Sequence, residues 1–291
     1  MISIVITSFK EPKTIGKAIE AILNQKINDD YELIVAAPDD ETLDVAKKYK
    51  KVTIFKDPGK GKSFALNLLF KKLKSDILVF TDGDVFLGEN SINGILKIFE
   101  DEKIGVVSGR PVSDDNKKNM FGYWSHLLLD AGAHNIRKKL FTKGKFLECT
   151  GYLFAFRNKI VDKIPLDVAE DSYIPYVFWK KGYNIGYCED AKVYIKNPTN
   201  LKDWLKQKAR TSKAHETLQH YAPDFPRVKS FTNEVLYGVF WALSYPRTIK
   251  EFFWTLNLFF IRFYMWMLVF VDTKFKKKTY SDGWERVEST K

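Results

Sequence analysis

The sequence predicts an α/β fold built on a mostly parallel, doubly wound sheet. Along the first 110 residues, short β-branched runs alternate with stretches of amphipathic, helical periodicity. This alternation is typical of units in which a helix carries the chain from one parallel strand to the next. The expected strands are Ile2–Ile6, Glu32–Ala36, Val52–Phe55, Ile77–Thr81 and Ile104–Ser108, and the expected helices are Thr14–Gln25, Glu41–Lys50, Ser63–Lys74 and Glu89–Glu100.

Beyond residue 110 the pattern is looser. We expect a polar loop, a long helix, an apolar strand and a second helix at Ser113–Asn119, Phe121–Leu140, Leu147–Phe156 and Asp171–Lys181. A basic amphipathic helix follows over Leu201–His220. The sequence contains no internal repeat and no low-complexity tract.

Composition narrows the class of protein. With 291 residues and 45% hydrophobic content, the chain can bury one substantial core and carry an appendage. Two cysteines are too few for a disulfide framework, and Met1–Ile6 does not have the pattern of a secretory leader, so we expect a reducing cytoplasm. The net charge of +11 favours an anionic partner. Because the aromatic residues concentrate near the C-terminus, we expect a membrane surface and no nucleic acid.

Two aromatic-rich stretches lie near the C-terminus, at Val235–Tyr245 and Phe252–Val271, and Lys274–Lys278 follow the second. A membrane-spanning helix needs about 20 apolar residues without a central charge, and Arg262 is near the middle of the second stretch. We therefore expect amphipathic helices lying in the membrane interface, monotopic or peripheral, on the cytoplasmic face. A buried hairpin, a dimer interface and a single span remain alternatives. The expected division is an α/β domain over 1–225, a helical pair over 226–280 and a tail over 281–291.

An Asp-Gly-Asp sequence follows the fourth expected strand. Asp82 and Asp84 flank Gly83 directly after Ile77–Thr81. In a doubly wound sheet, ligands bind beyond the carboxyl ends of the strands. A hard divalent cation takes one or two carboxylate ligands from the protein and others from a substrate diphosphate. An ordinary turn is the alternative, but the position after an apolar strand favours a metal site.

Together with this motif, three segments resemble the family 2 glycosyltransferases of the GT-A fold, over about residues 1–220. Ile4–Glu11 is similar to the first strand and nucleotide-binding turn of that family, Ala36–Thr42 to its acidic segment, and Gly61–Asn67 to its Gly-Lys…Ala-Leu-Asn signature. The resemblance implies an inverting transfer from a nucleotide-diphosphate sugar with Mn²⁺ or Mg²⁺. The implied donor-site residues are Thr7, Phe9, Glu11, Asp39 or Asp40, Lys62, Asp82 and Gly83, with Asp82 and Asp84 on the metal.

Some of these segments have other interpretations. Asp39-Asp40 could form a simple turn, and Gly61–Ser63 could be the start of a helix. Gly59–Ser63 superficially looks like a phosphate-binding P-loop, but that motif needs a glycine where this chain has Lys56. The P-loop is therefore excluded.

The candidate base is at the start of the helix expected near residue 171. An inverting transfer needs a carboxylate to take the proton of the acceptor, and in the resembled family a Glu-Asp pair supplies it, which here is Glu170-Asp171. A helix N-cap is the alternative for Asp171. Cys149–Arg157 is similar to the acceptor-side strand of the family, so that Gly151 would allow close approach of a sugar.

The basic helix carries two partial motifs. Gln207–Thr211 resembles the Gln-x-x-Arg-Trp motif of the family, but Thr211 replaces the tryptophan of processive synthases, which argues against processive chain growth. Arg210 and Lys213 resemble an Arg-x-x-Lys pair of polyprenyl-phosphate (dolichyl-phosphate) mannose synthase-like enzymes, and positions three apart share a helix face. Arg110 is a candidate third cation. The alternative for the pair is a solvated helix face.

Two histidines of this helix, His215 and His220, are five residues apart, whereas a helical zinc site needs a spacing of four. We expect them to be surface residues, and the alternative for His215 is a position near the diphosphate of the donor.

The resemblance therefore implies a sugar transfer to a lipid-linked or polyprenyl-phosphate acceptor at a membrane, with GDP-mannose favoured and a UDP-sugar as the alternative donor. A second possible acceptor is a hydroxyl of a polysaccharide or glycolipid. A nucleotidyltransferase is disfavoured because its Gly-rich, basic opening loop is missing. A non-catalytic basic membrane adaptor with the same fold is the rival of another class.

Overall fold

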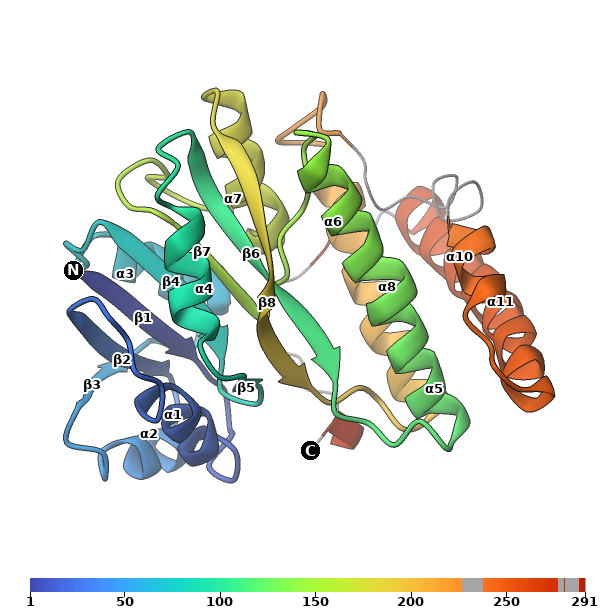
Figure 1. The fold of residues 1–291 in the computed structure, drawn as a ribbon, viewed down its shortest axis with the longest axis horizontal. Coiled ribbons are helices and arrows are strands. Elements are labelled where there is room, and N and C mark those ends of the chain that lie inside the picture. The colour runs from blue at the N-terminus through green and yellow to red at the C-terminus, as the bar shows by residue number, and fades with distance from the viewer. Residues whose placement is uncertain (227–237, 277–279, 281–287, 291) are drawn as a thin grey trace.

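The computed structural model describes residues 1–226, 238–276, 280 and 288–290. At its centre is an 8-stranded sheet in the order β3-β2-β1-β4-β7-β6-β8-β5 (Figure 1). The strands are β1 (Ile2–Thr7), β2 (Tyr31–Ala37), β3 (Val52–Lys56), β4 (Ile77–Asp82), β5 (Phe86–Leu87), β6 (Ile104–Ser113), β7 (Leu153–Arg157) and β8 (Asn184–Ile195).

Most neighbouring strands in this sheet are parallel. β1 pairs in parallel with β2 and β4, β2 with β3, and β6 with β8, whereas β7 runs antiparallel to both of its neighbours and β5 to β8. The predicted mostly parallel sheet is thus confirmed. The register pairs Thr7 with Asp82 at the carboxyl ends of the two central strands, which is the edge where ligands bind in such sheets.

Helices cover both faces of the sheet. Because successive side chains of a strand point to opposite faces, Ile4 and Ile6 of β1 belong to one buried cluster and Val5 to another. The first cluster includes side chains of α1 (Ile15–Leu23), α2 (Asp40–Ala46) and α4 (Ser91–Ile98), and the second those of α3 (Lys62–Phe70) and α7 (Glu170–Lys180). All of these helices were expected, with ends shifted by a few residues.

Two strands were missed and one is shorter than expected. β5 is only two residues long and β8 is interrupted by polar residues, so neither had the expected apolar pattern. The expected strand Leu147–Phe156 begins only at Leu153. The preceding backbone is bonded elsewhere, since the Cys149 N–H donates to the Asp171 carbonyl at 3.1 Å and the Thr150 N–H to Ser108 Oγ at 3.1 Å.

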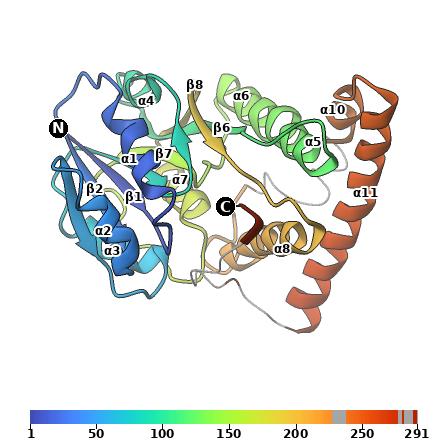
Figure 2. The same cartoon turned by 90° about the horizontal axis from the view of Figure 1, so that it is seen from below.

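A layer of helices packs beside the sheet (Figure 2). It contains the continuous helical stretch of α5 (Met120–Leu127), the π-helical Leu128–His134 and α6 (Asn135–Thr142), then α8 (Leu201–Leu218), α10 (Val239–Ser244) and α11 (Ile249–Phe270). A third buried cluster joins these helices through Trp124, Trp204, Leu258 and Met265. The C-terminal helices therefore pack on the rest of the chain through their own apolar cluster.

α11 is the outermost element, at the right of Figure 1. Among the described residues, Ile249–Thr273 is the one helical segment that is long and apolar enough to cross a membrane. The first expected C-terminal stretch begins within residues 227–237, outside the described residues, and most of the expected tail is also outside them.

Candidate active site

A cavity of about 1450 Å³ extends from the carboxyl end of β4 to the inner face of α11. Its walls bring together residues of the sheet edge, of the segment before β7, of the start of α7 and of α8. The site residues predicted from the sequence that line it are Thr7, Phe9, Glu11, Lys62, Asp82, Asp84, Gly151, Glu170, Asp171, Gln207 and Arg210. Most of the predicted residues therefore share one cavity.

A buried ion network surrounds Asp82 at one part of the cavity wall. Lys62, the first residue of α3, places its ammonium 2.7 Å from Asp82 Oδ1 and 2.8 Å from Glu170 Oε1. Thr7 Oγ1 donates to the same Asp82 oxygen at 2.9 Å. Burial alone would lower the pKa of Lys62, but the carboxylates of Asp82 and Glu170 raise it well above its usual value. Lys62 is therefore a fixed positive charge.

Gly83 is required by close packing. A Cβ atom at this position would lie 2.3 Å from Ser8 Oγ and 2.8 Å from Glu11 Oε2, well inside van der Waals contact. The Gly83 N–H donates to the Thr7 carbonyl at 2.9 Å. The glycine thus lets the turn after β4 lie directly against the turn after β1, where Ser8 Oγ donates to Glu11 at 2.6 Å.

Asp82 and Asp84 fit a divalent cation that is shared with a substrate. Both carboxylates line the cavity. Among the described residues, no group of three or more His, Cys, Asp or Glu side chains could hold a metal ion. Two carboxylates beside an open cavity suit Mg²⁺ or Mn²⁺ when a diphosphate supplies further oxygens. These residues therefore fit a metal that binds together with its substrate.

Asp39 and Asp40 lie outside the cavity walls. Asp39 is the N-cap of α2, and its carboxylate accepts hydrogen bonds from the Thr42 N–H at 2.9 Å and the Lys10 N–H at 2.7 Å. Partial burial tends to raise its pKa, but these hydrogen bonds lower it overall. Asp40 forms an exposed ion pair with Lys56 at 2.7 Å. The structure thus places both in the turn at the start of α2, and Asp39 tethers the turn after β1.

Asp171 lines the same cavity. It is the second residue of α7, after the N-cap Ala169, so it does not cap the helix. A Cβ atom on Gly151 would lie 3.4 Å from Asp171 Oδ2. Gly151 therefore leaves the space next to the carboxylate open, as a base that must reach a substrate requires.

The predicted site residues of the basic helix α8 lie in two different places. Gln207 and Arg210 line the cavity, and Gln207 Oε1 is buried without a hydrogen-bond partner among the described residues. Lys213 instead forms an ion pair with Asp272, beyond α11. The structure does not bring Arg210 and Lys213 together in the cavity, because the acidic partner of Lys213 is on another helix.

Arg110 is also outside the cavity walls. One of its terminal nitrogens lies 3.7 Å from Asp130 Oδ1, so it is paired with a carboxylate of the helical layer. The structure therefore does not bring the expected third cation to the cavity.

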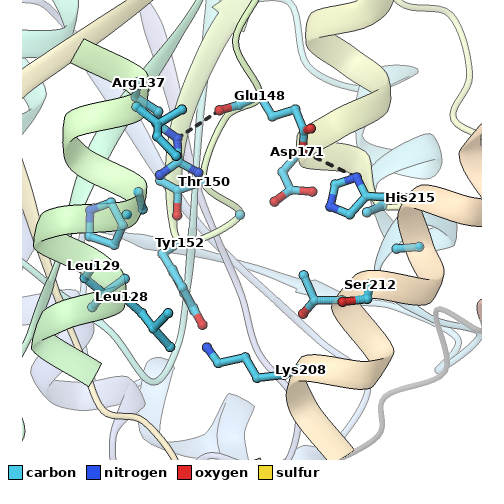
Figure 3. Close-up of a pocket in the computed structure, with 18 of the residues that line it drawn as sticks. Leu128, Leu129, Arg137, Glu148, Thr150, Tyr152, Asp171, Lys208, Ser212 and His215 are labelled. Carbon is cyan, nitrogen blue, oxygen red and sulfur yellow. Dashed lines mark hydrogen bonds and ion pairs between the residues drawn. The ribbon is translucent and has the colours of Figure 1, made fainter. Parts of the chain in front are cut away.

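The expectation for the histidines is wrong for His215, which is 6% exposed and lines the cavity. Its Nδ1 lies 3.4 Å from Oε2 of Glu148, which is 2% exposed and also accepts a hydrogen bond from Ser172 Oγ at 3.1 Å (Figure 3). A buried carboxylate needs such partners. His220 is exposed, as expected.

Arg137, Glu148 and Tyr152 are among the cavity residues that were not predicted from the sequence. Glu148 interrupts an apolar run, and that interruption was a usable signal. Arg137 gave no signal because it lies in a basic stretch, and Tyr152 none because aromatic residues are common in strands. Burial raises the pKa of the Tyr152 phenol, so it remains a neutral hydrogen-bonding group beside Lys208 in the cavity (Figure 3).

A family model described as "Glycosyltransferase like family 2" matches residues 1–214. The probable glycosyltransferase YdaM of Bacillus subtilis is 24% identical over 294 residues, covering 94% of this chain and 66% of that protein. The poly(ribitol-phosphate) beta-N-acetylglucosaminyltransferase TarP of Staphylococcus aureus is 23% identical over 208 residues, covering 67% of this chain and 62% of that protein. The chain thus spans less than two thirds of the length of these relatives.

Solved structures show the same fold. The mannosyltransferase PcManGT from Pyrobaculum calidifontis, in complex with GDP-Man and Mn²⁺, matches with a TM-score of 0.65 at 16% identity, covering 95% of this chain and 88% of that chain. Glucosyl-3-phosphoglycerate synthase from Mycobacterium tuberculosis, in complex with Mn²⁺, UDP and glucosyl-3-phosphoglycerate, matches with a TM-score of 0.54 at 19% identity, covering 76% and 79%. The fold is therefore the GT-A fold.

Proposed function

Because the chain belongs to glycosyltransferase family 2, we propose that it is an inverting, metal-dependent hexosyltransferase that acts on a lipid-linked acceptor at the cytoplasmic face of a membrane. One observation carries this proposal. A single cavity is lined by Asp82 and Asp84, by Asp171, and by Arg262 and Phe263 of α11. The two candidate metal ligands, the base and the outer helix α11 can thus contact the same donor and acceptor.

The residues suggest the following reaction. The acceptor oxygen attacks the anomeric carbon of the donor sugar from the face opposite the diphosphate, and its proton passes to Asp171. The bond between the anomeric carbon and the diphosphate oxygen breaks, so the configuration inverts. Asp82 and Asp84 would hold a divalent cation, which when bound would neutralise charge on the departing diphosphate. Lys62 holds the two carboxylates Asp82 and Glu170 in place.

GDP-mannose is the first donor to test, and UDP-sugars are the second. The mannosyltransferase from Pyrobaculum calidifontis is similar in fold over most of this chain and was solved with GDP-Man, but other GT-A structures hold UDP. For the acceptor, the separation of Lys213 from the cavity removes the main argument for polyprenyl phosphate. We therefore favour a sugar hydroxyl of a lipid-linked acceptor, with polyprenyl phosphate and a polysaccharide or glycolipid hydroxyl as alternatives.

A transfer assay tests the proposal directly. The protein is incubated with radiolabelled GDP-mannose or UDP-sugars, Mn²⁺ and a lipid extract, and label is counted in the butanol-soluble fraction. We expect metal-dependent incorporation from one donor into lipid, and an inverted anomeric linkage by NMR. A retained configuration would contradict the mechanism. Incorporation only into water-soluble polymer would favour the polysaccharide acceptor.

The membrane assignment rests on the outer face of α11. Phe253 and Phe260 are 63% and 73% exposed, whereas Leu258 and Met265 of the same helix are buried in the helical layer. Arg262, the central charge that argued against a span, lines the cavity. The charged side of α11 thus faces the protein and the aromatic side is available to lipid, as in helices that lie in a membrane interface.

We expect the double variant Phe253→Ser/Phe260→Ser to bind anionic lipid vesicles at least about tenfold more weakly than wild type, because burying one Phe side chain contributes about 1.5–3 kcal/mol. Vesicle flotation measures this binding. Leu166→Ser removes an exposed apolar side chain of the α/β domain and serves as the control that keeps binding. If wild type does not float and light scattering shows a dimer that the double variant lacks, the face is a dimer interface instead.

A further inference from the structure

Arg137 is a buried cation that has no acidic partner among the described residues. It is the third residue of α6, is 7% exposed and lines the cavity. Its Nε donates to the Glu148 carbonyl at 2.9 Å and its Nη2 to the Cys149 carbonyl at 3.1 Å. Its Nη1 is buried and has no hydrogen-bond partner in the part of the chain that the structure describes. Among the described residues, no carboxylate balances the guanidinium charge of Arg137, and no acceptor receives a hydrogen bond from its Nη1.

This arrangement is costly in the free protein. An arginine cannot release its proton in a protein, and a buried donor without a hydrogen-bond partner destabilises the folded state. Carbonyl groups accept hydrogen bonds but do not neutralise the charge. The nearby Glu148 carboxylate does not do so either, because it is turned toward His215 and Ser172 (Figure 3). An oxyanion from a ligand would supply both the missing acceptor and the missing charge.

Arg137 lies near Asp171, the proposed base, so an anion bound to Arg137 would lie near the reacting oxygen. Arg137 and Asp171 bond to the same residue, since the Cys149 carbonyl accepts from Arg137 and the Cys149 N–H donates to the Asp171 carbonyl. One residue of chain spans at most about 3.6 Å. In Figure 3, Arg137 and Thr150 lie on the side of the cavity across from Asp171 and His215. An anionic group bound at Arg137 would thus lie close to the acceptor oxygen that reacts.

We propose that Arg137 forms an anion subsite for the acceptor, which carries a carboxylate or phosphate oxyanion at or next to its reacting hydroxyl. This inference rests on the proposed transferase function and specifies the acceptor class. Lys139, Lys143 and Lys145, which follow Arg137 along the chain, also line the cavity, and their positive field attracts an acidic acceptor. A neutral sugar would leave Arg137 as it is in the free protein.

The opposing interpretation is that Arg137 only braces the backbone. Arg157, at the end of β7, is a comparison residue with the same backbone contacts. Its Nε donates to the Ile104 carbonyl and its Nη2 to the Phe99 carbonyl, both at 2.9 Å. Arg157 is only partly buried and does not line the cavity. The two arginines therefore share the bracing role and differ in their access to a ligand.

The experiment measures binding of small probes to the protein saturated with its nucleotide and Mg²⁺. Glucuronate and inorganic phosphate are the anionic probes, glucose is the neutral one, and calorimetry or ligand-observed NMR gives the dissociation constants. We expect wild type to bind at least one anionic probe about tenfold or more tightly than glucose. Arg137→Lys should lose about tenfold of that affinity because a lysine cannot reproduce the planar fork, and Arg157→Lys should keep it.

The outcomes distinguish a failure of the anion subsite from a failure of the proposed transferase function. If glucose binds wild type as tightly as both anions, or if Arg137→Lys and Arg157→Lys bind the anions equally, the subsite is overturned. The wild-type comparison holds even if Arg137→Lys fails to fold. Preference for glucuronate identifies a carboxylate and preference for phosphate identifies a phosphorylated acceptor. Nucleotide binding in the same samples reports on the transferase function, and its failure would overturn that function whatever the probes do.

Discussion

Asp171→Asn is expected to lower kcat by a factor of about 10²–10⁴ while the binding of nucleotide and metal stays unchanged. The amide has nearly the same shape as the carboxylate but cannot accept the proton of the acceptor. Asp171 lies beside the opening left by Gly151 and is not one of the two carboxylates, Asp82 and Glu170, that pair with Lys62. The measurement is the steady-state rate at saturating donor, together with the dissociation constant for the nucleotide.

The matched control is Asp167→Asn. Asp167 is four residues earlier, accepts a hydrogen bond from the Tyr221 hydroxyl at 2.7 Å and is outside the cavity walls. Its variant should keep full activity. A rate loss of about tenfold or less in Asp171→Asn, well below the usual range for loss of a general base, would mean that the acceptor needs little deprotonation, as a polyprenyl phosphate would. An unchanged rate would remove Asp171 from the mechanism.

Lys62→Met is expected to reduce the free energy of unfolding by about 3 kcal/mol, near the lower end for the loss of one partner from a buried ion pair. The substitution leaves Asp82 and Glu170 without their shared cation, and their side chains are 25% and 7% exposed. The partial exposure of Asp82 lets water recover some of the loss. Denaturant titration at pH 7 measures the change.

The control for Lys62 is Lys56→Met, which removes the cation from the exposed pair with Asp40 and should not change stability measurably. The pH dependence adds a second check. Because the pKa of Lys62 is raised in the folded protein, its stabilisation is fully present below the unfolded lysine pKa of about 10.4 and is lost as pH rises through the folded pKa. Between pH 6 and 9 the difference between wild type and Lys62→Met should therefore stay constant, to within about 0.5 kcal/mol. A difference that vanished within this range would contradict the fixed charge.

The first half of the fold could be predicted because each of its elements is encoded locally. β1 and β4 are largely apolar runs, and α1 and α4 each show one apolar face. Such periods are visible in the sequence alone. β8 was missed because polar residues at Glu189 and Asp190 interrupt it and because its partner β6 is about 80 residues away.

The site was predictable where a motif combines several residues at fixed spacing. Asp82, Gly83 and Asp84 form one such motif, and the register with β1 brings Thr7 to it without further information. Interactions between distant segments were not predictable. The pairing of Lys213 with Asp272 joins residues 59 apart in the chain, and no spacing within α8 reports it.

The acceptor end was the least predictable part for the same reason. Arg137, Glu148 and His215 come from three separate elements, and only the packing of α6 and α8 around the segment before β7 brings them to one cavity. Each residue alone has a common structural interpretation. Their functional interpretation depends on their burial in the cavity, which cannot be read from the sequence.

The central claim is that Asp82 and Asp84 bind a nucleotide through a shared divalent cation. The measurement is calorimetric titration of GDP and of UDP, with and without Mn²⁺, into wild type and Asp84→Ala. We expect wild type to bind one nucleotide only when the metal is present, and Asp84→Ala to bind it at least about tenfold more weakly, a loss of about 1.4 kcal/mol or more. Binding of neither nucleotide by folded wild type, or equal metal-dependent binding by the variant, would contradict it and favour a non-catalytic membrane adaptor.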